Sequence, residues 1–153
     1  MSYSEDERQL KLILKEIINS TAGLKYAIII DDTGITILSE SKFNFDDVSV
    51  EKIGAIGGAV FTAGEEQGYI LGYGNINLQI TEYDKGLLFS VKIGRGVLCI
   101  ATDKKVQMGY IVAVMKRYAN NLESILNRYL KGDQGELNKE LKELFNTDSA
   151  GLL

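Results

Sequence analysis

Asp32-Thr33-Gly34 is the segment whose residue types could most directly do chemistry, because it places a carboxylate in a turn after the apolar run of residues 26–30. If two copies of the chain brought their Asp32 side chains together, the pair would share one proton, since two close carboxylates cannot both ionise. Such a dyad hydrolyses peptide bonds. The other interpretation is a plain hairpin turn, in which the carboxylates bond to nearby backbone N–H groups.

The motif resembles the catalytic turn of retroviral-type aspartic proteases, which are also homodimers, and Ile93-Gly94-Arg95 loosely resembles their second apolar-glycine motif. Those proteases consist almost entirely of β-strands. Three long segments of this chain instead keep a helical period, and no convincing flap is present. The sequence therefore favours the hairpin turn and leaves the protease as a remote alternative.

Other catalytic chemistry is restricted by the absence of histidine. Serine–histidine and cysteine–histidine nucleophile pairs are impossible, and so are the usual zinc sites. The single cysteine, Cys99, lies in a predicted strand and is expected to be a small buried hydrophobe, which also excludes an intrachain disulfide. We expect no catalytic residue, no metal and no cofactor, and hence a protein that is not an enzyme.

The glycine motifs do not predict a nucleotide site. Residues 54–57 lack the Lys-Ser or Lys-Thr of a phosphate-binding loop. Residues 72–74 and 94–96 each lack the third glycine of a dinucleotide fingerprint and are expected to be turns. Arg95, at the tip of the second of these turns, could reach a partner's phosphates, but a solvated turn residue is favoured. Asp46 and Asp47 could bind a cation, but capping of a following helix is favoured.

Composition restricts the partners. The net charge is −4, with 17 basic and 21 acidic residues and no basic stripe, which argues against nucleic acid. The first residues are polar and acidic, so we expect no signal peptide and a cytoplasmic protein. The longest apolar run, residues 27–30, is too short to insert directly into a membrane.

Hydrophobic periodicity predicts the element order helix–strand–strand–helix–strand–strand–strand–helix. Ser4 and Glu7 form a capping box for the first helix, and Asp103 is expected to cap the third. After a break at residues 131–135, a short amphipathic helix is expected, followed by a frayed end. The elements are expected at about residues 5–21, 26–30, 35–39, 49 to between 68 and 72, 75–83, 87–93, 97–102 and 103–130.

The third strand is predicted to be an interface. Its apolar residues Ile76, Leu78 and Ile80 alternate with polar ones, so they are expected on one side. If this strand lies at the edge of the sheet, its unpaired backbone invites a second copy to pair with it.

The second helix carries glycines that each cost about 1 kcal/mol relative to alanine. Small residues let another backbone approach closely, either a helix of a partner copy, which we favour, or the chain's own sheet. The predicted dimer interface comprises Ile53, Gly57, Val60, Phe61, Gly64, Ile76, Leu78 and Ile80.

The element order, the hairpin of residues 27–39, the helix that ends in Gly64-Glu65-Glu66 and the meander that closes in Ala101-Thr102-Asp103 resemble the roadblock/LC7 domain over residues 10–126. Gly109 follows where family members commonly carry glycine. The family includes the dynein light chain roadblock type and the polarity-GTPase regulator type.

The resemblance implies an α+β, profilin-like fold with a five-stranded antiparallel sheet in the order 2-1-5-4-3. The first and third helices would cover one face and the second helix the other. It also implies a dimer through the third strands and second helices. Residues 1–130 would form this domain, and residues 131–153 would be a C-terminal extension.

Family members generally act as dimeric platforms for small Ras-like GTPases or for motor and membrane-associated complexes. We therefore expect a homodimeric, non-enzymatic scaffold that binds and can regulate a small Ras-like GTPase. The alternative is a structural adaptor in a motor- or membrane-tethering complex that binds no GTPase.

Overall fold

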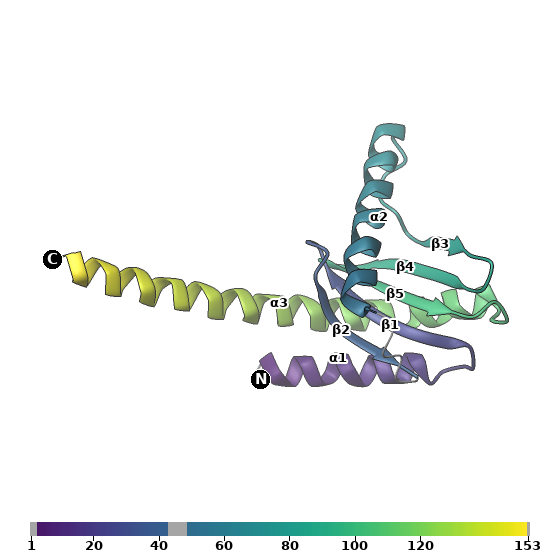
Figure 1. Cartoon of the computed structure of the whole chain (residues 1–153), viewed down its shortest axis with the longest axis horizontal. Helices are drawn as coiled ribbons and strands as arrows, with labels where there is room; N and C mark the ends of the chain where they lie inside the picture. Colours follow the sequence, from purple (N-terminus) through teal and green to yellow (C-terminus); the bar gives the residue numbers. More distant parts are fainter. Residues whose placement is uncertain (1–2, 43–48, 153) are drawn as a thin grey trace.

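The computed structural model describes the backbone of residues 3–42 and 49–152, and the side chains of residues 5–42, 49–132 and 139–145. The strands form one antiparallel sheet in the order β2-β1-β5-β4-β3 (Figure 1). This confirms the predicted α+β fold and its strand order. The elements are α1 (Tyr3–Ile18), β1 (Leu24–Asp31), β2 (Thr36–Ser41), α2 (Val50–Leu71), β3 (Gln79–Glu82), β4 (Leu87–Ile93), β5 (Gly96–Thr102) and α3 (Met108–Leu152).

Helices cover both faces of the sheet, as predicted (Figure 1). α1 and α3 pack on one face over the larger apolar cluster, which includes Leu14 and Ile29. α2 crosses the other face over a smaller cluster that includes Ile30 and Phe61. β1 lies between β2 and β5 and is buried on both faces, which explains its continuous apolar run.

The helix starts differ from the predictions. α1 begins one residue before Ser4, so the predicted capping box is wrong. α2 is capped by Ser49, whose Oγ accepts a hydrogen bond from the backbone N–H of Lys52 at 3.2 Å. The alternative caps, Asp46 and Asp47, lie outside the described residues.

Asp103 does not cap α3. Its Oδ1 accepts a hydrogen bond from the N–H of Lys105, two residues later, at 2.8 Å. Its own N–H donates to the carbonyl of Gly23. Asp103 therefore closes a turn. The helix starts later, where the carbonyl of Gln107 accepts a hydrogen bond from the N–H of Ile111. Aspartate side chains close such local turns as well as cap helices, and here the turn takes the hydrogen bond of Asp103.

α3 runs without interruption through residues 131–135, so the predicted break is wrong. Glycine costs only about 1 kcal/mol in a helix, and the chain has no proline to force an end. The division into a domain of residues 1–130 and an extension stays a prediction. Figure 1 shows the end of α3 running far past the sheet. Within the described part of the chain, no helix is long and apolar enough to span a membrane.

Candidate protein interface on helix α2 and strand β3

β3 is an edge strand, as the sequence predicts. It pairs with β4 from Gln79, opposite Ser90, to Glu82, opposite Leu87. In the described part of the chain, no strand pairs with its other side. The strand covers only residues 79–82, so it is shorter than the predicted 75–83. An unpaired edge offers backbone N–H and C=O groups to another chain.

The three apolar residues of this segment do not share one side. Ile76 packs against the cluster beneath α2, whereas Leu78 packs against the cluster beneath α1 and α3. The predicted alternation is therefore wrong before residue 79. Bends at residues 75 and 77 interrupt the strand period. In addition, the N–H of Ile76 donates to Oε2 of Glu65 on α2 at 2.9 Å, which holds this residue toward the helix.

Glu65 links three elements, and the sequence interpretation missed it. Besides accepting from Ile76, its Oε1 lies 3.7 Å from Nζ of Lys92 on β4. The side chain is mostly covered and so fastens the second half of α2 to the sheet and to the segment that leads into β3. A carboxylate on the buried side of a helix is the only sequence signal that could have indicated this role.

The glycines of α2 face the chain's own subunit, which contradicts the favoured interpretation of contact with a partner helix. A Cβ atom on Gly54 would collide with Oγ1 of Thr36 on β2. One on Gly58 would lie 3.0 Å from Cα of Gly34, and one on Gly64 would lie 2.7 Å from Cδ1 of Ile76. The close approach that these glycines permit is therefore used within one copy.

The eight predicted interface residues differ in their solvent exposure within one subunit. Gly57 and Phe61 are buried in the subunit's own core, so they are not available to a partner. Val60 and Ile80 are exposed, at 49% and 37%. The remaining four are half-buried: Ile53, Gly64, Ile76 and Leu78.

α2 also presents an apolar face that the sequence interpretation missed in part. Residues spaced alternately by three and four fall on one side of a helix and form a seam of the coiled-coil kind. Ile56 and Ile70 belong to this face and are 58% and 82% exposed. We call it the α2 stripe, and it comprises Ile53, Ile56, Val60, Ala63, Gln67 and Ile70.

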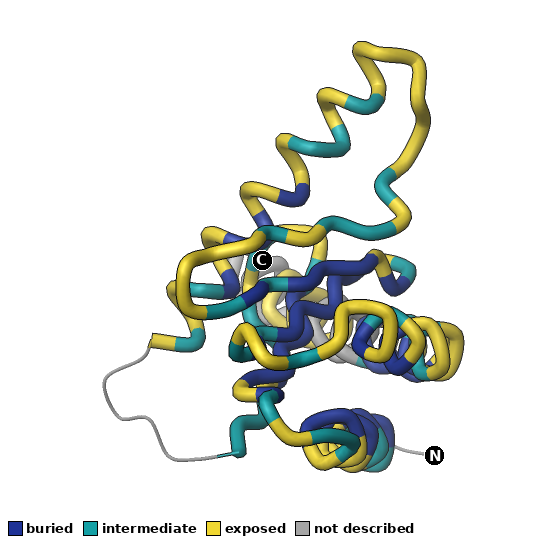
Figure 2. Tube along the Cα trace, turned by 90° about the vertical axis from the view of Figure 1, so that its right-hand side faces the viewer, coloured by how far each residue is buried: buried dark blue, intermediate teal, exposed yellow. Residues whose placement is uncertain are grey.

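The last turn of α2 is a rigid apolar tip. Gly72 ends the helix in the left-handed conformation, and the N–H of Tyr73 donates to the carbonyl of Gly68 at 2.8 Å, which is a Schellman cap. The tip carries exposed Tyr69, Leu71 and Tyr73. Figures 1 and 2 show this end of α2 projecting beyond the β3 edge, so it extends over the position that a partner sheet would occupy.

The residues considered for catalysis have structural roles. Asp31, rather than Asp32, organises the hairpin turn, because its Oδ1 accepts from the N–H groups of Thr33 and Ile35 at 2.8 and 3.0 Å. Asp32 is exposed and lies 3.7 Å from the guanidinium of Arg95. The α+β fold also differs from the all-β proteases. Within the described residues, no group of acidic or cysteine side chains could hold a metal ion.

Cys99 is buried, as predicted. Its Sγ lies 3.3 Å from Oγ of Ser90 on β4. Burial raises the pKa of the Cys99 thiol, and the contact with Ser90 opposes that shift only in part. The thiol therefore stays protonated and is a core residue rather than a nucleophile.

Comparison with known proteins places this geometry in a class. No family model matches the chain. The chain is similar to the structure described as MglB with tetrameric arrangement, with a TM-score of 0.75 and 17% identity over 81% of this chain and 92% of that one. It is also similar to a roadblock/LC7 domain from Streptomyces avermitilis, with a TM-score of 0.66 and 16% identity over 78% and 96% of the two chains. The fold is a roadblock/LC7 domain.

Comparison of sequences gives relatives of higher identity than these structural neighbours. The chain is 31% identical to the uncharacterized protein MJ0310 of Methanocaldococcus jannaschii over 108 residues, which cover 71% of this chain and 92% of that protein. The chain belongs to the same family as MJ0310.

Proposed function

We propose that this chain is a homodimeric, non-enzymatic scaffold of the cytoplasm that binds a small Ras-like GTPase and regulates its nucleotide cycle. The observation that carries the proposal is the pairing of an open β3 edge with an exposed α2 stripe on a roadblock/LC7 fold. The β3 edge has no strand partner within the described part of one copy, and Ile56, Val60 and Ile70 of the stripe are exposed.

In the proposed dimer, the β3 strands of two copies pair and the two α2 helices lie antiparallel. The spacing of the α2 stripe is compatible with this arrangement. Antiparallel pairing sets Val60 against Ala63 of the second copy, and Ile53 against Ile70 of the second copy. A standard interface buries about 800 Å² on each partner, which is within reach of a strand edge and a 22-residue helix.

GTPase binding is proposed from the similarity to MglB and from the general role of roadblock domains as dimeric platforms. The described residues offer acidic and apolar surface, and the proposed effect on a GTPase would come from binding one nucleotide state more tightly than the other.

The test is a binding measurement between the purified protein and the small Ras-like GTPases encoded in the same genome. Each GTPase is loaded either with GDP or with a non-hydrolysable GTP analogue. Binding that differs between the two states supports the proposal. Absence of binding in both states contradicts it and supports the structural adaptor. A variant that cannot dimerise is the control for whether the platform must be a dimer.

A further inference from the structure

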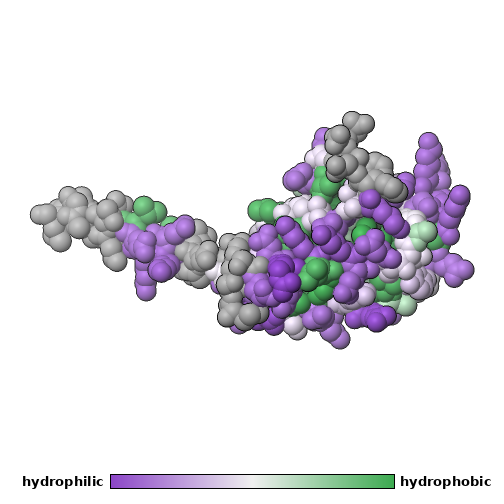
Figure 3. Space-filling view, turned by 90° about the horizontal axis from the view of Figure 1, so that it is seen from below, coloured by the Kyte–Doolittle hydropathy of each residue, from purple (hydrophilic) through white to green (hydrophobic). Residues whose placement is uncertain are grey.

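The last part of α3 exposes apolar side chains where its side chains are described, at residues 139–145. Residues 131–152, which we call the arm, continue α3 beyond the sheet (Figure 1). Leu141, Leu144 and Phe145 lie on one side of the arm and are 43%, 61% and 69% exposed. Figure 3 shows this apolar surface on the projecting segment beside hydrophilic atoms. An isolated helix of this length is marginal in water, so a covered apolar face is needed to stabilise it.

A groove opens on the other side of the sheet, at the end of the molecule where the arm leaves. We call it the end groove. It lies between the β1–β2 turn, the β4–β5 turn and one flank of α2, and its volume is about 590 Å³. This volume falls in the range of pockets that take up sizeable apolar groups. Its floor and walls are mostly small or apolar: Gly34, Ala55, Ala59, Phe61, Thr62 and Val97.

The end groove adjoins the proposed dimer surface, because Ala63 belongs to the α2 stripe and also lines the groove. Thr62 lines the groove and Val60 belongs to the α2 stripe, and two residues that are two positions apart point about 200° apart on a helix. Pairing of two α2 stripes therefore covers the Ala63 side of the groove and leaves its Thr62 side facing away from the contact.

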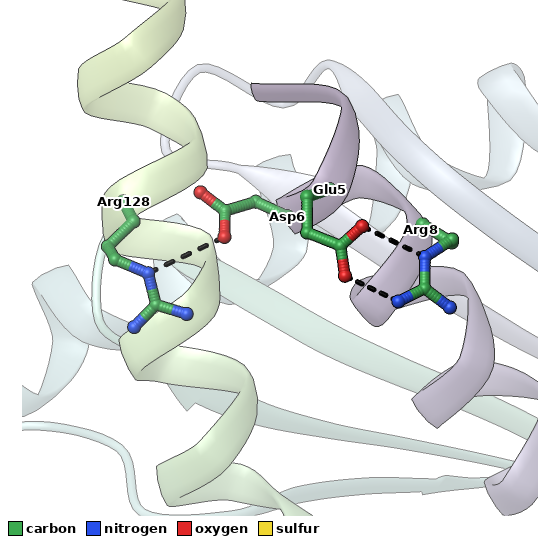
Figure 4. Close-up of polar contacts among 4 residues, drawn as sticks. All are labelled: Glu5, Asp6, Arg8 and Arg128. Atoms are coloured by element: carbon green, nitrogen blue, oxygen red, sulfur yellow. Dashed lines mark hydrogen bonds and ion pairs between the residues drawn. The ribbon is translucent and has the colours of Figure 1, made fainter. Parts of the chain in front are cut away.

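The arm and the end groove are held in fixed relation. The β4–β5 turn, which forms one wall of the groove, rests on α3 just before the arm begins. A Cβ atom on Gly94 would lie 2.8 Å from Oδ1 of Asn127, and one on Gly96 would lie 2.6 Å from Cδ2 of Leu126. One residue later, Nε of Arg128 lies 3.5 Å from Oδ1 of the buried Asp6 on α1 (Figure 4).

This geometry decides which groove the arm can reach. The straight arm runs away from its own domain (Figure 1), so it cannot enter its own groove while α3 stays continuous. A second copy, related by a two-fold axis at this end, would present its groove to the arm of the first copy and receive its own arm in return. Such a reciprocal contact is self-complementary and closes without leaving a free arm.

Both surfaces carry charges of both signs. The groove rim carries acidic Asp32 and Glu66 and basic Lys92. Glu140 and Lys142 flank the apolar side of the arm, so it presents both signs beside its leucines. We infer that the arm of one copy docks in the end groove of a second copy, with Leu141, Leu144 and Phe145 as its anchors, and that this contact joins copies independently of β3 pairing.

The test measures molecular mass and association by sedimentation equilibrium. Leu141→Asp/Leu144→Asp removes the anchors, and Thr62→Lys fills the groove, where the new lysine can pair with Glu66 one turn later. Each variant is expected to halve the mass of the largest species and to weaken this association at least tenfold. Lys139→Asp, on the opposite side of the arm, is the matched control and is expected to leave the mass unchanged. Circular dichroism verifies that every variant is folded.

A mixture of the two variants separates this exchange from other arrangements. Each mixed pair keeps one intact contact, formed by the normal arm of the groove variant and the normal groove of the arm variant. We therefore expect partial recovery of the larger species. A mass that responds to the arm variant but not to Thr62→Lys would indicate arm–arm pairing and overturn the inference. No response to either variant would overturn it as well. Failure of β3 pairing is distinguishable, because it leaves the response to both variants in place.

Discussion

Val60→Asp is the sharpest test of the proposed dimer, because Val60 lies near the middle of the α2 stripe and about half of its side chain stays exposed in one subunit. Burying a whole valine contributes about 1.5–3 kcal/mol. Since Val60 is already about half covered at 49% exposure, roughly 0.8–1.5 kcal/mol per copy remains to be gained on dimerisation.

The substitution removes that gain twice in a symmetric dimer, a loss of roughly 1.5–3 kcal/mol. It also places two carboxylates in an apolar contact near the two-fold axis, where desolvation and mutual repulsion add an unfavourable term of similar size. We therefore expect the dissociation constant of the dimer to rise at least about 100-fold. The unfolding free energy of the single subunit should fall by no more than roughly 0.8–1.5 kcal/mol, which is the contribution of the half of the side chain that the subunit already covers.

The assay is sedimentation equilibrium over a range of protein concentrations, with Leu141→Asp/Leu144→Asp in both the reference and the variant so that the arm contributes no association. Thr62→Asp in the same background is the matched control, because it adds the same charge to the same helix on the side opposite the stripe. A folded Val60→Asp protein with an unchanged dissociation constant would refute the α2 pairing. Equal weakening by Thr62→Asp would show that charge on α2, rather than the stripe, is responsible.

Three further predictions concern single residues. Glu65→Ala leaves the backbone N–H of Ile76 without its acceptor and should lower the free energy of unfolding, measured in urea, by about 1–3 kcal/mol. Glu65→Gln keeps an acceptor oxygen and should lose less stability. Equal losses in the two variants would contradict the hydrogen-bond role. Gly68→Ala places a Cβ 2.6 Å from the carbonyl oxygen of Gly74 and should lower the melting temperature. The Cβ of Gly109→Ala meets nothing within 4 Å, so this variant should raise the unfolding free energy by up to about 1 kcal/mol and the melting temperature with it. The pKa of the Cys99 thiol is raised in the folded state, so its contribution to the unfolding free energy is complete below the ordinary thiol pKa and is lost as pH rises through the folded value. Above roughly pH 8.5 the unfolding free energy should therefore fall with a slope of up to about 1.4 kcal/mol per pH unit. Cys99→Ala should remove that part of the slope.

Two features of the sheet illustrate how far local pattern reaches, whereas its strand order followed from the family resemblance. The continuous apolar run of residues 26–30 predicted a strand covered on both faces, and β1 occupies that position. Tight glycine turns predicted the β3–β4–β5 meander, and the structure contains it. These predictions hold because spacing and turn chemistry act over a few residues, which is the range that a sequence shows directly.

The candidate interface was harder to predict. The glycines of α2 indicated a close approach, but the sequence could not say whether the approaching backbone belonged to the same copy. Gly58 faces the hairpin at Gly34, so the same copy uses this space. Ile56 and Ile70 had a readable spacing, yet the same spacing also describes a buried face, and only the packing of the helix on the sheet shows which side is covered.

The sequence by itself determined most of the elements and their order, because periodicity and turn residues constrain the chain locally, whereas the edge position of β3 followed only from the family resemblance. The tertiary structure alone decided which face of α2 is exposed, how Glu65 draws Ile76 out of the strand pattern, and that α3 continues through Gly132 and Gly135. Those features depend on contacts between residues far apart in the chain, and a carboxylate, a glycine or an isoleucine acquires its role only from the neighbour that folding brings beside it.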